Sequence, residues 1–217
     1  IKPDFIFHLA AQSLVIDSYK KPVITMQTNV LGTQNVLESI RHLNKCLAVF
    51  ITSDKCYENI ETKRGYKESD RLGGKDIYSS SKASAEILIN SYFNSFFKDN
   101  KHIRIATARA GNVVGGGDWN KNRLVPDCIK SWSKNKTVVL RNPKSTRPWQ
   151  HVLEPLRGYI DLSRKLYSSS MYSGKNYNFG PQINKNYTVE ELVKGMSLHW
   201  KKVKWQIERN RSSYFES

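Results

Sequence analysis

Apolar residues in the first half of the chain form three short continuous runs, at 4–10, 46–53 and 103–110. Each run has the length of a strand and does not alternate with polar residues, which is typical of strands buried on both faces. Between them, residues 29–43 and 77–98 carry apolar side chains at helical spacing. Alternating strands and helices of this kind predict an α/β fold with a doubly wound parallel sheet.

Each expected helix has an apolar stripe that should face the sheet. A shorter helical segment at 16–28 is expected to break near Pro22, because proline cannot donate the backbone hydrogen bond of a helix interior. The side chains expected on the buried stripes are Val30, Leu37 and Ile40 in the helix at 29–43, and Ile87, Leu88, Tyr92 and Phe96 in the helix at 77–98.

The regular alternation of strand and helix loosens after residue 114. We therefore expect an N-terminal region at 1–114 and a smaller region at 115–217, some segments of which return to the sheet. The elements expected in the second region are strand-like segments at 137–143, 147–152 and 176–180 and helices near 153–167 and 188–200.

The composition is typical of a globular protein, with 39% hydrophobic and 25% charged residues among 217. No run reaches the ~18 apolar residues of a membrane helix, and residues 1–12 lack the basic segment and cleavage site of a signal peptide. The cysteines, Cys46, Cys56 and Cys128, form no Cys-x-x-Cys pair, which favours a reducing cytoplasm over a disulfide framework. Carboxylates and imidazoles show no metal-ligand spacing, so we expect no metal.

The net charge of +16 leaves two kinds of partner open. A protein this basic can bind nucleic acid. The charge is nevertheless spread along the chain, and only residues 199–205 and the tail after them are locally dense in basic side chains. An anionic small molecule needs only a few basic residues around a pocket, and we favour it over nucleic acid.

Residues at the predicted strand ends point to one reaction centre. In a doubly wound sheet, ligands bind outside the carboxyl ends of the strands. The segments "HLAAQS", "TSDKCY" and "RAGNVVGGGDW" follow the three strands, and the helix at 77–98 begins with Tyr78, four residues before Lys82. A tyrosine with an ordinary pKa near ~10 is a weak base at neutral pH, and a lysine one turn away stabilises its phenolate. The spacing alone also fits two solvated polar residues, but the convergence at one sheet edge favours chemistry.

In this order, the segments resemble the extended branch of the short-chain dehydrogenase/reductase superfamily. The resemblance rests on "HLAAQ", "TNVLGT", the strand end with Ser53, the pair Tyr78 and Lys82, and "RAGNVVG", and it covers nearly the whole chain. Within the superfamily, "TSDKCY", "ARAGNVVGGGDW" and "RPWQHVLEPLRGY" are similar to CDP-glucose 4,6-dehydratases. The resemblance implies a Rossmann-like fold, NAD as cofactor and CDP-glucose as substrate.

One feature of that superfamily, the glycine-rich phosphate loop near the start, does not occur in this sequence. "VVGGGDW" follows a late strand and lacks the G-x-G-x-x-G spacing. We therefore expect the catalytic middle of a longer enzyme. Residues 1–114 are then a partial dinucleotide-binding domain that carries the catalytic residues, and residues 115–217 are mostly a substrate-binding region.

The resemblance assigns roles to single residues. It implies that Tyr78 takes the proton of the sugar 4-hydroxyl with the help of Ser53 and Lys82. It also implies that Asp54 is the acid, and Lys55 the base or enediolate stabiliser, for loss of water. The residues implied at NAD are His8, Ala10, Ala11, Gln12, Asn29, Thr52, Tyr78 and Lys82, and those implied at the sugar nucleotide are Asn112, Arg123 and Arg147.

The implied activity is conversion of CDP-glucose into CDP-4-keto-6-deoxyglucose by internal hydride transfer, a step of deoxysugar biosynthesis such as that of lipopolysaccharide O-antigens. The implied enzyme is a cytoplasmic homodimer or homotetramer assembled through the helices at 29–43 and 77–98. One alternative is another NAD-dependent nucleotide-sugar epimerase or dehydratase of the same branch. Asp54 and Lys55 favour the dehydratase, because a simple epimerase needs no second acid and base. A basic nucleic-acid-binding protein is the alternative outside enzymes.

Overall fold

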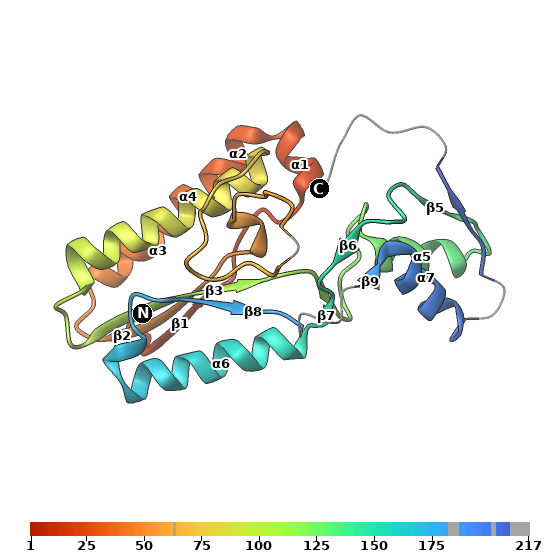
Figure 1. Ribbon diagram of the computed structural model, residues 1–217. Helices are drawn as coiled ribbons and strands as arrows, with labels where there is room; N and C mark the ends of the chain where they lie inside the picture. Colours follow the sequence, from red (N-terminus) through yellow and green to blue (C-terminus); the bar gives the residue numbers. More distant parts are fainter. Residues whose placement is uncertain (63, 182–186, 201–202, 209–217) are drawn as a thin grey trace. The chain divides into compact units, whose positions relative to one another are not determined.

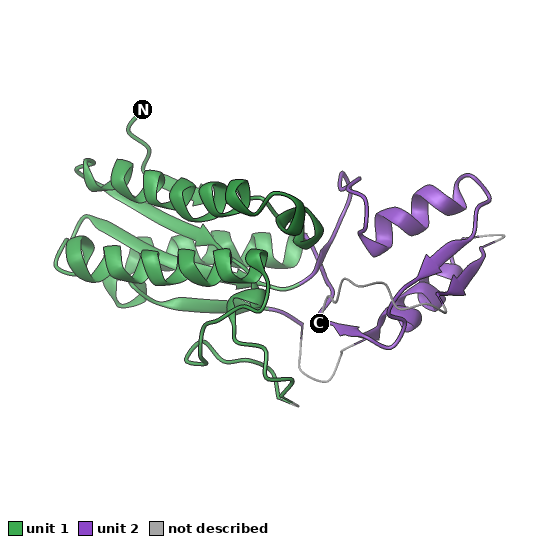
Figure 2. Cartoon of the chain, turned by 90° about the horizontal axis from the view of Figure 1, so that it is seen from above, with its two compact units in different colours: residues 1–111, 153–179 green, residues 112–152, 180–217 purple. Residues whose placement is uncertain are grey.

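The computed structural model describes residues 1–62, 64–181, 187–200 and 203–208. The chain forms two compact units, which Figure 2 shows in different colours. Unit 1 comprises residues 1–111 and 153–179, and unit 2 comprises residues 112–152 and 180–217. Residues 153–179 therefore return from the second half of the sequence to unit 1. The roles expected for regions 1–114 and 115–217 stay predictions.

Unit 1 is built on a parallel sheet, which confirms the expected α/β class. Its strands lie in the order β1-β2-β3-β8, and each neighbouring pair is parallel. The run at 103–110 forms a strand along its whole length, whereas the first two strands are shorter than their apolar runs. The bounds are β1 (Phe5–His8), β2 (Cys46–Ile51), β3 (Ile103–Ala110) and β8 (Asn176–Phe179).

Helices cover both faces of this sheet, as Figure 1 shows. The chain breaks between α1 and α2 at Lys21, directly before Pro22, as expected. Two turns of π-helix, η1 and η3, extend the helices that the sequence predicts as single elements. One face carries α1 (Val15–Lys20), α2 (Pro22–Met26), η1 (Gln27–Leu31), α3 (Gly32–Arg41), α4 (Ile77–Tyr92) and η3 (Phe93–Phe97), and the other carries α6 (Leu153–Ser168), which η4 (Ser170–Tyr172) follows.

The core of unit 1 lies on both sides of the sheet. Along β2, Ala48 and Phe50 pack with the α3 and α4 side, whereas Leu47 and Val49 pack with the α6 side. All four side chains are buried. This is the physical reason for a continuous apolar run, because neither face of the strand meets water.

The buried stripe of α4 differs from the expected one. Ile87 is 57% exposed and Phe96 is 45% exposed, so that expectation is wrong for both. The face that packs inward carries Lys82, Glu86 and Ile89 instead. Lys82 and Glu86 are polar yet buried, and Glu86 is paired with Arg109, so apolar periodicity does not identify this face.

Unit 2 is smaller and contains short paired strands. Its core includes Cys128, Trp132 and Val193. The pairs are β4 (Val113–Val114) with β7 (Gln150–His151), β5 (Val138–Leu140) with β10 (Trp205–Ile207), and β6 (Thr146–Arg147) with β9 (Tyr187–Thr188); the helices are α5 (Leu124–Trp132) and α7 (Val189–Ser197).

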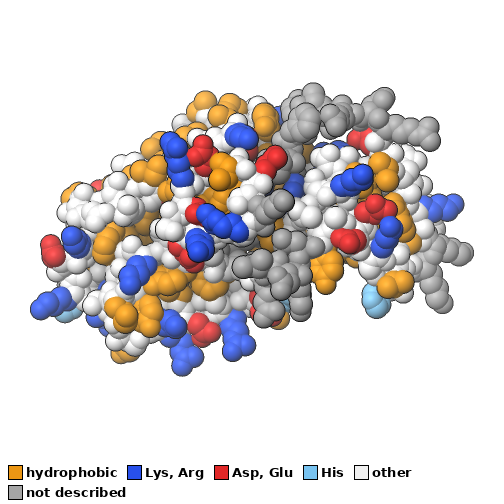
Figure 3. All heavy atoms as spheres, viewed as in Figure 1, with side chains coloured by type: hydrophobic (Ala, Val, Ile, Leu, Met, Phe, Trp, Pro, Cys, Tyr) orange, Lys and Arg blue, Asp and Glu red, His pale blue; other side chains and the backbone are white. Residues whose placement is uncertain are grey.

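Two bulk properties complete the description. Among the described residues, no helix is long and apolar enough to cross a membrane. On the face shown in Figure 3, the Lys and Arg side chains of unit 1 are dispersed among acidic and hydrophobic ones rather than gathered into one patch. This dispersion does not favour a nucleic-acid surface on that face.

Candidate active site

The helix α4 starts at a well-defined cap. Asp76 accepts hydrogen bonds from the backbone nitrogen of Ser79 (3.0 Å) and from the Ser79 hydroxyl (2.7 Å). Before it, Gly74 packs on the first turn so closely that an added Cβ would lie 2.3 Å from the nitrogen of Ser80. The sequence "GGKD" therefore fixes where the helix begins, and with it the position of Tyr78.

Tyr78 and Lys82 are both buried, with exposed fractions of 7% and 6%. They lie one turn apart on α4, as the spacing predicts. Burial lowers the pKa of Lys82 from 10.5 to about 8, although the nearby charges of Glu86 and Cys56 raise it. The pair is thus shielded from water, and the lysine changes its charge near pH 8 rather than near 10.5.

The turn after β2 packs against α4. It is a single 3-10 turn, η2 (Asp54–Cys56), and Ser53 caps it. The Ser53 hydroxyl accepts a hydrogen bond from the backbone nitrogen of Lys55 (3.2 Å) and donates one to Asp54 Oδ1 (3.0 Å). Cys56 packs with Ala83 of α4. The elements that carry Ser53, Asp54 and Lys55 on one side, and Tyr78 and Lys82 on the other, are therefore in direct contact.

The segment after β1 is held by the π-helical turn η1. Asn29, buried in that turn, accepts a hydrogen bond from the backbone nitrogen of Gln12 (2.8 Å) and donates to its carbonyl (3.0 Å). Asn29 also donates to the hydroxyl of Ser81 on α4 (2.8 Å), and the Gln12 amide donates to Thr25 (2.8 Å). Asn29 thus links the end of β1 to the helix of Tyr78.

His8 lies at the end of β1 and takes part in the same region. Its Nε2 lies 3.3 Å from the Thr33 hydroxyl. Burial, and then the charge of Lys82, lowers the pKa of His8 below its ordinary value of 6.5. A neutral imidazole is therefore favoured here at neutral pH. Thr52, at the end of β2, is buried next to Ser53.

The three residues expected at the sugar nucleotide all belong to unit 2. The carbonyl of Asn112 accepts a hydrogen bond from the nitrogen of Gln150 where β4 meets β7 (3.0 Å). Arg147, in β6, donates from Nη1 to the carbonyl of Thr146 (2.9 Å). Arg123 precedes α5 and lines a pocket. The nucleotide contacts of these residues stay predictions.

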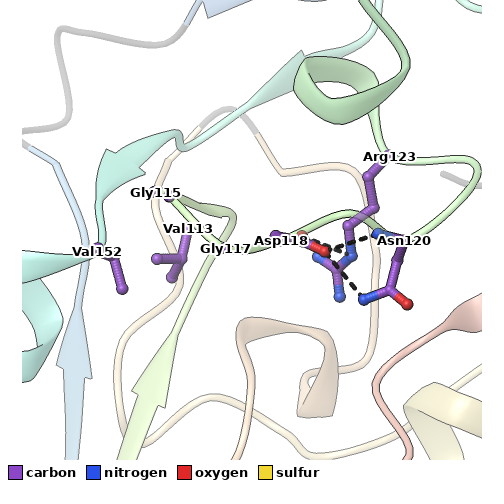
Figure 4. A pocket seen from close by; sticks show the side chains of 8 residues that line it. Val113, Gly115, Gly117, Asp118, Asn120, Arg123 and Val152 are labelled. Carbon is purple, nitrogen blue, oxygen red and sulfur yellow. Dashed lines mark hydrogen bonds and ion pairs between the residues drawn. The ribbon is translucent and has the colours of Figure 1, made fainter. Parts of the chain in front are cut away.

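That pocket has a volume of about 400 Å³ (Figure 4). Asp118 accepts hydrogen bonds from the Asn120 backbone nitrogen (3.1 Å) and side-chain amide (2.9 Å), and its Oδ2 lies 3.2 Å from Nε of Arg123. A Cβ at Gly115 would lie 2.5 Å from Val152, so this wall requires glycine. The lining residues are Val113, Gly115, Gly116, Gly117, Asp118, Asn120, Arg123 and Val152.

Comparison with known proteins identifies the family. The sequence profile described as GDP-mannose 4,6 dehydratase matches residues 1–214. The chain belongs to this family. CDP-glucose 4,6-dehydratase of Salmonella typhimurium is 47% identical over 204 residues, which are 92% of this chain and 57% of that protein. The chain therefore spans a little over half the length of that relative.

Solved structures show that the chain has a Rossmann-type α/β fold. DesIV, a dTDP-glucose 4,6-dehydratase from Streptomyces venezuelae with NAD and DAU bound, has a TM-score of 0.76 and 23% identity over 95% of this chain and 61% of its own. UDP-glucuronic acid 4-epimerase from Bacillus cereus has a TM-score of 0.81 and 20% identity over 96% of this chain and 63% of its own. At these identities the likeness shows the fold alone.

Two buried charged residues of this member of the GDP-mannose 4,6 dehydratase family, Glu86 and Arg109, do not belong to any motif predicted from the sequence. Glu86 and Arg109 form an ion pair in which each side chain is 1% exposed. The signal was present, because Arg109 interrupts an apolar strand and Glu86 follows Lys82 by one helical turn. A charged residue in a strand buried on both faces requires a partner. Among the described residues, no group of His, Cys, Asp and Glu could hold a metal ion.

Proposed function

We propose that the protein is a nucleotide-sugar 4,6-dehydratase that converts CDP-glucose into CDP-4-keto-6-deoxyglucose and water. The observation that carries the proposal is the packing of α4, with Tyr78 and Lys82 buried in it, against the turn that carries Asp54 and Lys55. The 47% identity to the Salmonella CDP-glucose 4,6-dehydratase supports the choice of nucleotide sugar.

NAD fits the carboxyl ends of β1 and β2. Ala10 is exposed and Ala11 half-buried, so this segment offers small side chains to a flat ring, and Gln12, which follows them, is fixed by Asn29. When bound, NAD supplies a reversible hydride acceptor. DesIV, which shares the fold, was solved with NAD. The residues that would hold it are His8, Ala10, Ala11, Gln12, Asn29, Thr52, Tyr78 and Lys82.

Tyr78 and Lys82 account for the first half of the reaction. The Tyr78 phenolate accepts the proton of the sugar 4-hydroxyl while C4 loses a hydride and becomes a ketone. The Lys82 ammonium stabilises the phenolate. The Ser53 hydroxyl holds the sugar hydroxyl against Tyr78.

Asp54 and Lys55 account for the second half. The new ketone acidifies the C5 proton, which Lys55 removes while Asp54 protonates the departing 6-hydroxyl, so that one water leaves. A hydride then adds to C6 and a proton returns to C5, which completes the balance. The sugar is oxidised at C4 and reduced at C6, with no net redox change.

The test is product analysis with the protein expressed from its complete gene. CDP-glucose and dTDP-glucose are incubated in parallel, and mass spectrometry is expected to find a product lighter by one water, formed faster from CDP-glucose. Tyr78→Phe keeps the ring and removes only the hydroxyl, so it should slow turnover about 10²–10⁴-fold. A product of unchanged mass with an inverted hydroxyl would instead make the protein an epimerase.

Two further variants separate the acid from the base. In Lys55→Met, solvent deuterium should not enter C5, and reduced nicotinamide should accumulate on mixing with CDP-glucose. In Asp54→Asn, exchange at C5 should persist while water loss slows. If Lys55→Met formed product at the wild-type rate, Asp54 and Lys55 would be an ordinary surface turn.

We also propose self-association through α3 and α4. Leu31, Ile87 and Phe96 are exposed apolar side chains on these helices or the π-helical turns that extend them. A homodimer or homotetramer would cover them. Light scattering during gel filtration should show a smaller particle for Ile87→Glu than for the control Ile60→Glu, whose apolar side chain is exposed in a loop.

A further inference from the structure

Arg109 is the largest fully buried side chain among the described residues, and the proposed reaction does not use it. Its Nε and Nη2 donate to the two carboxylate oxygens of Glu86 (2.9 and 3.0 Å). Its Nη1 donates to the Tyr57 hydroxyl (2.8 Å) and to the carbonyl of Glu68 (3.1 Å). The guanidinium is therefore fixed on three sides, as only a planar fork with several donors can be.

The partners of this guanidinium come from distant parts of unit 1. Thr52, directly after β2, donates a short hydrogen bond to Glu86. The Tyr57 hydroxyl donates to Asn178 of β8 (2.7 Å), and the Tyr57 ring stacks on Tyr66 with centroids 5.1 Å apart. We call Arg109, Glu86, Thr52, Tyr57 and Asn178 the Arg109 network.

The network touches the proposed active site at three points. Glu86 follows Lys82 by one turn of α4. Thr52 and Tyr57 are the residues immediately before and after the segment 53–56, which contains the proposed acid and base. One buried ion pair thus holds both ends of that segment and the helix that carries Tyr78.

We propose that Arg109, Glu86 and Tyr57 are positioning residues that hold the Asp54–Lys55 turn in register with Tyr78 on α4. We expect the position of the Asp54–Lys55 turn, and not that of α4, to depend on these three residues. The inference rests on the proposed function, because it assigns the network to the water-loss half of the reaction. A displacement of about 1 Å at a reacting group can lower a rate about 10²-fold, so such a network affects rate as well as stability.

The helix has other anchors, so the two halves of the reaction should respond differently. Ile89 and Tyr92 of α4 are in the core between the sheet and α3, and Asp76 caps the first turn. Tyr57, by contrast, fixes the C-terminal end of the turn through its hydroxyl and its ring. Loss of that hydroxyl should loosen the turn and leave α4 in place.

The test compares Tyr57→Phe with Tyr92→Phe in the complete gene product. Both substitutions remove one hydroxyl, and Tyr92 donates to Glu38 (2.7 Å) away from the turn. In Tyr57→Phe, water loss from CDP-glucose should slow about 10- to 100-fold, while the first oxidation, followed by reduced-nicotinamide absorbance in a single turnover, stays near wild type. In Tyr92→Phe, both rates should stay near wild type.

Hydrogen–deuterium exchange provides a readout that needs no turnover. Backbone exchange at 53–57 should accelerate in Tyr57→Phe and not in Tyr92→Phe, while exchange across 77–92 stays slow in both. If the wild type dehydrated neither CDP-glucose nor dTDP-glucose, the proposed function would fail, and the exchange at 53–57 would still decide whether the network holds the turn. Unchanged exchange at 53–57 overturns the inference.

A double variant removes the ion pair without leaving either of its own two charges unpaired. Glu86→Leu with Arg109→Met replaces the pair with apolar groups of similar size, a change that proteins often tolerate. We expect it to fold, with faster exchange at 53–57 and a larger loss in the water-loss step than in the first oxidation, which also slows because Glu86 no longer raises the pKa of Lys82. If it dehydrates CDP-glucose at the wild-type rate, or if both half-reactions fall equally, the network is only structural and the inference is wrong.

Discussion

The two units contain contrasting Arg–carboxylate pairs. In unit 1, Arg109 and Glu86 are each 1% exposed and meet at 2.9 Å. In unit 2, Arg123 and Asp118 are 35% and 32% exposed and meet at 3.2 Å. Burial alone would lower the pKa of Arg109, but the hydrogen bonds and charge of Glu86 outweigh it and raise that pKa above its ordinary value, whereas about a third of each side chain of the second pair is exposed.

The contrast shows two uses of the same chemical pair. A buried pair is costly to break, because each charge left alone has no water to solvate it. Such a pair suits residues that must keep one geometry through a reaction. A half-exposed pair gains little from its partner and can exchange it for an anion at small cost. Arg123, which lines a pocket, is suited to that second use.

The largest effect on stability is expected for Glu86→Gln. The glutamine amide would place donors against the donors of Arg109 and leave its charge uncompensated. We expect a loss of about 3–5 kcal/mol in the free energy of unfolding, measured by urea denaturation. The control is Glu38→Gln, a pair partner of Arg41 at a 37% exposed site, which should cost less than about 1 kcal/mol. Equal losses of unfolding free energy in Glu86→Gln and Glu38→Gln would mean that burial does not make the Arg109–Glu86 pair more important for stability.

The fold was predictable because its strands are apolar on both faces. The strand at 103–110 and the start of the helix at 77 follow from hydrophobicity and from the Asp76 cap. The buried stripe of α4 was not predictable by the same rule, because Lys82 and Glu86 occupy it. Apolar periodicity finds a buried helix face only when that face is apolar.

The candidate site was predictable to a different degree. Tyr78, Lys82, Asp54 and Lys55 lie on two elements in contact, and motif order located both elements. Arg109 was missed because its partner lies 23 residues away, on another element. A pairing between distant elements depends on topology, which a local sequence pattern does not contain.

A second prediction concerns the other buried cation, Lys82. Its pKa falls from 10.5 to about 8 in the folded protein. Between these values the unfolded chain binds more protons than the folded one, so stability should rise with pH from about 8 to about 10.5, by about 3 kcal/mol at about 1.4 kcal/mol per pKa unit. Lys82→Met should abolish this rise, whereas Lys45→Met, at a 55% exposed site, should keep it. The measurement is the urea midpoint of unfolding at pH 8 and pH 10. The same change in midpoint between these pH values for the wild type and both variants would refute the prediction.

A smaller effect, on binding alone, is expected for Arg147→Lys in unit 2. The substitution keeps the charge but replaces a planar fork with a point donor, which cannot contact a diphosphate at two oxygens. KM for CDP-glucose should rise about tenfold, equivalent to about 1.4 kcal/mol, with kcat nearly unchanged. Arg157→Lys, on α6 at an 84% exposed position, is the control and should leave KM unaltered. An equal fall in kcat would place Arg147 in the chemical step instead.

The smallest effect is expected for Asp118→Asn, the counterpart of Glu86→Gln. The asparagine oxygen can still accept the hydrogen bonds of Asn120, and the Arg123 side chain is 35% exposed, so its charge is not buried without water. The free energy of unfolding should therefore change by less than about 1 kcal/mol.

The same substitution should tighten binding, because Arg123 would no longer be neutralised by Asp118. KM for the anionic CDP-glucose should fall, and the fall should shrink as salt screens the charge. Urea denaturation and steady-state kinetics at two salt concentrations measure both quantities. A loss of several kcal/mol would mean that the loop pair is as structural as the buried one. A rise in KM would mean that Asp118 orients Arg123 rather than competing with the substrate for it. The two Arg–carboxylate pairs would then differ in burial, but both would serve to hold an arginine in place.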